Sequence, residues 1–149
     1  MFSTVRYFIK TSIIFLVIGI LSGLYMMIAR NYFDVWPNPD IVSAHTHIIL
    51  VGSIMMMIMG VALWFFPRPD KNDKFYNSDV ILFDYFLMMS STLIRFIAQI
   101  ISSINSPNSV LKLIITISSV GQVLAIMIFF ISMWGRIRSV GSHLREAKG

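Results

Sequence analysis

The chain has 149 residues, of which 56% are hydrophobic and 13% are charged, and its formal net charge is +5. A soluble domain of this length could not bury so many apolar residues, so the composition indicates an integral membrane protein. The absence of cysteine excludes disulfides, thiolate metal sites and Cys-linked haem.

Four apolar runs are each long enough to cross a membrane, which takes about 20 residues as a helix. The first run follows two positive charges but is too long for a signal peptide and lacks a small-residue cleavage site. Short loops rich in Pro, Asn and Asp separate the runs. The sequence therefore predicts one all-α domain, an up-down transmembrane bundle of four helices. The predicted spans cover about residues 8–29, 42–66, 80–103 and 110–134.

The positive charges predict the orientation of the bundle. Arg6 and Lys10 flank the start of the first run. Three more lie between the second and third runs and four follow the last: Arg68, Lys71 and Lys74, then Arg136, Arg138, Arg145 and Lys148. Because such flanks stay cytoplasmic, we expect both termini on the cytoplasmic side of a bacterial or archaeal cytoplasmic membrane. The net positive charge is then explained by the orientation of the bundle and by contact with membrane lipid, and nucleic-acid binding is not expected.

Polar side chains inside the predicted spans are the candidates for function, because their burial is costly. They are His45, His47, Asp84, Arg95, Gln99 and Gln122. No nucleophile-base constellation or carboxylate pair is recognisable, so no catalytic residue is assigned. Asp84 is predicted to pair with Lys71 or Lys74, with proton uptake as the alternative. His143 in the basic tail is expected to be solvated.

His45 and His47 open the second run, and their i, i+2 spacing directs them about 200° apart on a helix. They should therefore have different roles. The helix face below His45 carries Gly52 and Gly60, which would leave space for a flat plate. A neutral imidazole above such a slot suits axial ligation of haem iron, so His45 is the favoured ligand and His47 the second candidate. The alternative is that the histidines hydrogen-bond near the headgroups and the glycines only allow close packing.

Two arginines are predicted to contact the haem propionates, because a guanidinium can hold a carboxylate in a bidentate pair. Arg30 ends the first run, level with His45, where it could equally snorkel to water. Arg95 lies well inside the third run. Its alternatives are a polar pore lining or a hydrogen-bond clamp to Gln122, Ser118 or Ser119 of the fourth run.

The order of His45, Gly60 and the exit Trp64-Phe65-Phe66-Pro67 resembles the second helix of the catalytic subunit of haem-copper oxidases and nitric oxide reductases. In that family this helix begins with a low-spin haem ligand, and the small residues Gly19 to Gly23 also resemble its first helix. The resemblance covers about two thirds of the chain. The later helices that supply the remaining haem and copper ligands have no counterpart, so oxygen reduction by this chain alone is not expected.

Residues and resemblance together predict a membrane b-type cytochrome that binds haem b for electron transfer, haem sensing or storage. Its second axial ligand is expected from a symmetric homodimer, with Gly19 and Gly23 as a close-contact motif or as packing within the bundle. A quinol or another redox protein would exchange electrons with it.

Two other functions remain open. One is a cofactor-free subunit or assembly factor of a larger respiratory oxidase. The other is a copper-handling membrane protein that uses histidine and methionine. Copper is disfavoured because Met55, Met56 and Met57 are consecutive and point around the helix.

Overall fold

The computed structural model describes residues 2–66, 77–105 and 108–137, and all of its regular structure is helical. Four helical segments are long and apolar enough to cross a membrane. This confirms the predicted all-α fold with four apolar helices. The elements are α1 (Phe2–Phe33), α2 (Pro39–His47), the π-helix η1 (Ile48–Met55), α3 (Met56–Phe65), α4 (Ser78–Ile104), α5 (Ser109–Met133) and the 3-10 turn η2 (Trp134–Arg136).

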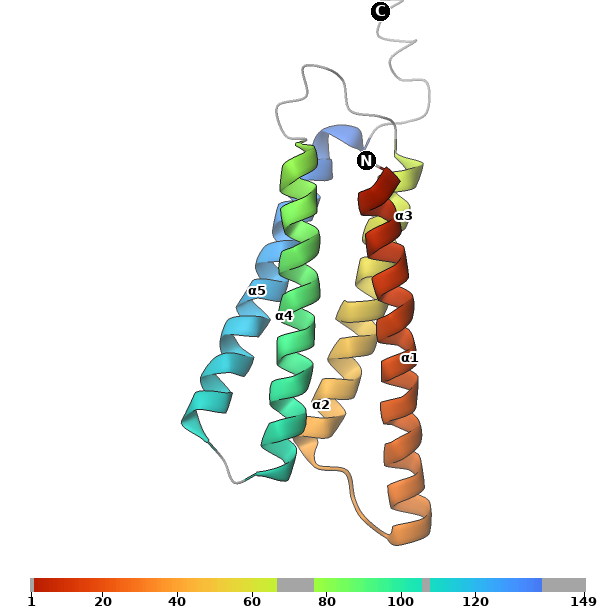
Figure 1. Ribbon diagram of the computed structural model, residues 1–149, viewed down its shortest axis with the longest axis vertical. Helices are drawn as coiled ribbons and strands as arrows, with labels where there is room; N and C mark the ends of the chain where they lie inside the picture. Colours follow the sequence, from red (N-terminus) through yellow and green to blue (C-terminus); the bar gives the residue numbers. More distant parts are fainter. Residues whose placement is uncertain (1, 67–76, 106–107, 138–149) are drawn as a thin grey trace, which may run out of the picture.

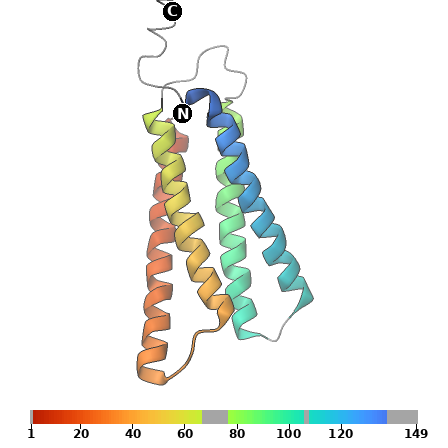
Figure 2. The ribbon, with the colours of Figure 1, turned by 180° about the vertical axis from the view of Figure 1, so that it is seen from behind.

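Consecutive helical segments run antiparallel, as Figures 1 and 2 show. The start of α1, the end of α3, the start of α4 and the end of α5 lie together, and we call this the terminal end of the bundle. The opposite end, where α1 and α4 end and α2 and α5 begin, is the loop end. Helix α1 packs along η1 and α3, α4 packs along α5, and α2 joins the two pairs by its contact with α4.

Asparagine side chains set three of the helix starts. Asn38, Asn77 and Asn108 each accept a hydrogen bond from the backbone N–H two residues later, at 2.8 to 2.9 Å. Such caps satisfy an N–H group that has no partner inside the helix. Helix α1 ends where Asp34 takes a positive φ of 51° and the Val35 N–H donates to the Ala29 carbonyl, which closes the last turn.

The second membrane segment differs from the single α-helix that was predicted. Its middle third, η1, is a π-helix, in which each turn holds more residues than in an α-helix. Short π segments inside α-helices often lie at functional sites. No proline marks the segment in the sequence, so periodicity alone could not reveal it. It begins directly after His47 and contains Gly52.

The densest core lies in the half of the bundle nearer the terminal end. Phe8 of α1 makes edge contacts with the rings of Tyr85 and Phe129, at centroid distances of 5.3 and 6.3 Å. The core therefore joins α1 to both α4 and α5. Its largest fully buried side chains are Phe8, Ile48, Met56, Met59, Leu63, Ile81, Met88 and Met133.

Candidate functional site

His45 is half-buried and held by α1. Its Nδ1 lies 3.0 Å from the Gly19 carbonyl oxygen and 3.1 Å from the Ser22 hydroxyl, which itself donates to the same carbonyl at 2.7 Å. A carbonyl oxygen can only accept, so this contact assigns the ring hydrogen to Nδ1 and leaves the lone pair on Nε2. Sequence reasoning missed both partners, although small residues one turn apart on α1 were a usable signal.

The glycines of α1 accommodate the second segment of the same chain. A Cβ atom on Gly23 would lie 2.8 Å from His45 Cε1, and one on Gly19 would overlap Ile49. Without side chains, these two positions let α1 approach α2 and η1 closely. In this structure Gly19 and Gly23 therefore serve packing within the bundle, which was the alternative to a dimer contact.

The glycine face below His45 exists, but α1 and α4 fill it. A Cβ on Gly52 would lie 2.7 Å from Thr92 Cγ2 and 2.9 Å from Phe15 Cδ2. A Cβ on Gly60 would lie 2.9 Å from Ile9 Cγ1 and 3.0 Å from Phe8 Cβ. The two glycines therefore act as packing notches, and this arrangement has no space for a flat plate beside either of them.

His47 is also half-buried, and its position two residues later directs it about 200° around the helix from His45. The i, i+2 spacing thus separates the two histidines as expected. Arg95 Nη1 donates to Gln122 Oε1 at 3.0 Å, and Gln122 Nε2 donates to Thr92 Oγ1 at 3.0 Å. Among the alternatives for Arg95, the structure shows the clamp to Gln122 of α5.

Arg95, Gln99 and Ser102 form a row of polar side chains on α4, which we call its polar stripe and which continues from this clamp toward the loop end. Gln99 Nε2 donates to Ser43 Oγ at 2.8 Å, and Ser102 Oγ donates to Asp40 Oδ2 at 2.7 Å. The stripe therefore faces α2 and α5 inside the bundle. Two of its buried atoms, Arg95 Nε and Gln99 Oε1, have no hydrogen-bond partner among the described residues.

Arg30 is exposed, and its guanidinium stacks 4.4 Å from the ring centroid of Trp36. It is not level with His45, as the sequence suggested, because His45 lies against Gly19 and Gly23. Arg30 follows Gly23 on the same face of α1 by about two turns, or roughly 10 Å. The structure therefore does not bring the residues of the predicted haem site together at one place. These residues are His45, His47, Arg30, Arg95, Gly52 and Gly60.

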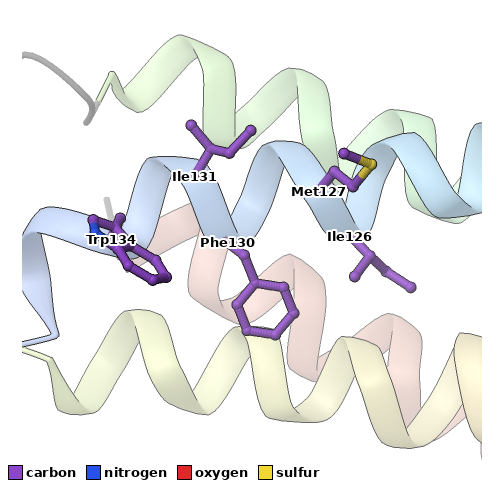
Figure 3. Close-up of a pocket in the computed structure, with 5 residues that line it drawn as sticks. All are labelled: Ile126, Met127, Phe130, Ile131 and Trp134. Carbon is purple, nitrogen blue, oxygen red and sulfur yellow. The ribbon is translucent and has the colours of Figure 1, made fainter.

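Two apolar grooves on the surface of α5 contain none of the predicted site residues. One has a volume of about 310 Å³ and follows successive turns of α5 (Figure 3); it is lined by Ile126, Met127, Phe130, Ile131 and Trp134. The other, of about 440 Å³, lies between α3 and α5 near the terminal end. Its lining includes Met57, Val61, Phe65, Phe129 and Met133. Such surfaces suit lipid chains.

Within the described part of the chain, no group of three or more His, Cys, Asp or Glu side chains could hold a metal ion. Met56, Met59 and Met88 are buried in the core. Asp84 is fully buried, and neither carboxyl oxygen has a hydrogen-bond partner there. Its predicted partners Lys71 and Lys74, like His143, lie outside the described residues.

No protein-family model, curated protein or solved structure matches this chain. The resemblance to the haem-copper oxidase family therefore stays a prediction that depends on His45, Gly60 and the aromatic exit of the second segment.

Proposed function

We propose that this protein is a membrane b-type cytochrome in which His45 ligates haem b through Nε2. The hydrogen bond between His45 Nδ1 and the Gly19 carbonyl carries the proposal. Histidines that ligate metals almost always donate their other ring N–H to a carbonyl, a carboxylate or water, which fixes the tautomer and the ring orientation. His45 has this hydrogen bond already, which leaves the lone pair of its neutral ring on Nε2.

The residues fit haem at His45 but not along the glycine face. Nε2 lies beside α1 as well, 3.5 Å from where a Cβ on Gly23 would be, so a haem held by Nε2 would border α1 at Gly23. The same face of α1 continues toward Arg30, whose guanidinium would hold a propionate in place of the Trp36 ring. The bound haem would supply one-electron chemistry. The surrounding chain would supply the ligand, its orientation and a largely apolar environment.

The second axial ligand would come from a second copy of the chain. His47 is the other histidine of the described residues, and the i, i+2 spacing directs it away from the side on which His45 contacts α1. A symmetric homodimer would bring two His45 side chains to one haem or two haems to one interface. The electron partner would be a quinol or another redox protein. A haem content of one per two chains, with a dimeric particle mass, would be the expected measurement for a shared haem.

The proposed orientation places the terminal end of the bundle in the cytoplasm. Arg6, Lys10 and Arg136 lie there, whereas Arg30 at the loop end is accompanied by Asp34 and Asp40. A reporter that is active only in the cytoplasm should therefore be active when fused after the last residue. The same reporter inserted between Asp34 and Asn38 should be inactive. The reverse pattern would contradict the orientation.

The visible spectrum of the purified protein tests the haem proposal. With haem supplied during expression, the reduced wild-type protein should show sharp b-type bands. His45→Ala should lose them because the ligand is removed, whereas the matched variant His47→Ala should keep them. A colourless wild-type protein would overturn the proposal. Loss of the bands only in His47→Ala would identify His47, and not His45, as the haem ligand.

The packing of the glycine face supports one other function. Phe8, Ile9, Phe15 and Thr92 already fill the notches at Gly52 and Gly60, as expected if these glycines serve helix packing alone. In that case the chain would be a cofactor-free subunit or assembly factor of a larger respiratory oxidase. It would be colourless, and it would be recovered from mild detergent together with the larger complex.

A further inference from the structure

Asp84 is an acidic side chain buried inside the bundle, on a helix that contributes to its apolar core. Its exposed fraction is 0%, and neither Oδ1 nor Oδ2 has a hydrogen-bond partner among the described residues. Ile81 and Met88, one turn to either side on the same face of α4, belong to the apolar core that α4 shares with α1, α3 and α5. Asp84 therefore occupies a position where an apolar residue would pack without cost.

Other ionisable side chains near the terminal end either have other hydrogen-bond partners or are exposed. Arg136 at the end of α5 donates to the carbonyl oxygens of Leu63 and Phe66 at 3.4 and 3.0 Å. The Tyr85 hydroxyl is hydrogen-bonded to Thr11 at 2.8 Å. Arg6 and Lys10 of α1 are exposed. In the described part of the chain, no cation compensates a carboxylate at Asp84.

The energetic comparison favours the neutral acid. An ionised carboxylate without a partner loses several kcal/mol of hydration even after the protein relaxes. A neutral polar group without a partner costs only about 1 to 3 kcal/mol. The closed bundle should therefore hold Asp84 in its protonated form. Ionisable groups inside a membrane span are costly and mark functional positions by default.

We propose that Asp84 is a proton-binding site inside the membrane, which holds its proton while the bundle is closed and exchanges it with the terminal end. The route is short, because Asp84 follows the first residue of α4, Ser78, by less than two turns, or roughly 9 Å. Ionisation requires water or a cation to reach the carboxyl from that side. The proposal does not depend on haem binding.

Infrared spectroscopy of the full chain in lipid tests the protonation. Aspartate labelled with ¹³C at its carboxyl should shift a carbonyl band of a protonated acid at neutral pH, because only a buried aspartic acid stays protonated there. Asp84→Asn should remove the band, whereas Asp79→Asn, an exposed position on the same helix, should leave it intact. The measurement on the labelled wild-type protein stands even if Asp84→Asn does not fold. Absence of the band from the folded wild-type protein would overturn the proposal.

Exchange is tested by pH and by chemical labelling. The acid band should disappear reversibly at alkaline pH. A band that persists at every pH where the protein is folded would show that Asp84 never releases its proton, and it would contradict exchange.

A hydrophobic carbodiimide should form an adduct at Asp84 and not at the exposed Asp34 or Asp79. In this reaction the acid proton moves to a reagent nitrogen and the carboxyl oxygen adds to the central carbon. The acyl group then migrates to nitrogen, so the peptide gains the whole mass of the reagent. No adduct at Asp84 at neutral pH, where the acid band is present, would mean that its carboxyl is never reached from outside and would contradict exchange at Asp84.

Discussion

Gly52→Leu should lower the free energy of unfolding by about 3 kcal/mol or more, the upper range for overpacking a core. The position is closed from two sides, since even a Cβ would lie 2.7 Å from Thr92 Cγ2 of α4 and 2.9 Å from Phe15 Cδ2 of α1. Neither neighbour can turn away freely, because Thr92 is buried and receives the Gln122 hydrogen bond while Phe15 is buried in the core. A leucine must therefore push α1 and α4 away from η1.

Thermal unfolding in one detergent, followed by circular dichroism, measures this effect. Ile54→Leu is the matched control, because Ile54 lies two residues away in η1 with 46% of its surface exposed. It should unfold like the wild-type protein. If Gly52→Leu were as stable as this control, the notch would be able to open. The glycine face could then admit a flat plate as the sequence first suggested.

The fold was predictable as far as hydrophobicity determines it. Four apolar runs gave four helices, because a helix that crosses lipid must be apolar over its whole length. The positions of the helix ends were harder to predict from the sequence. The first run was predicted at 8–29, but α1 covers Phe2–Phe33, since a helix continues past the hydrocarbon until a turn such as that at Asp34 ends it. The π-helix depends on tertiary packing and has no periodic signal.

The candidate site was predictable in its parts but not in its assembly. Helical spacing correctly separated His45 from His47 and grouped Gly52 and Gly60 on a face shared with His45. It could not tell whether that face is empty or filled, because this depends on how closely α1 approaches. The same limit applies to Arg95, for which Gln122 was one of several partners that the sequence left open.

The changes in stability caused by substituting Arg95 and Gln122 should be strongly non-additive, because the two side chains are hydrogen-bonded to each other. Gln122→Leu should destabilise the protein by about 2 kcal/mol, since it removes a hydrogen bond to a charged group and leaves the half-buried guanidinium with fewer partners. Arg95→Leu should cost about 1 kcal/mol, because Gln122 is neutral and keeps its hydrogen bond to Thr92.

The double variant Arg95→Leu with Gln122→Leu should be more stable than the sum of the two single effects predicts, because it removes the charge together with its partner. Replacing a buried polar pair by apolar residues of similar volume is often neutral or stabilising, whereas removing only the group that compensates a charge is costly. Denaturation of all four proteins in the same detergent gives the coupling energy, which should be about 1 to 2 kcal/mol. Gln99→Leu is the control, since Gln99 is hydrogen-bonded to Ser43 and not to Arg95, and it should show much weaker coupling with Arg95→Leu than Gln122→Leu does. Strict additivity of the two substitutions would mean that Arg95 reaches water and that the clamp contributes little.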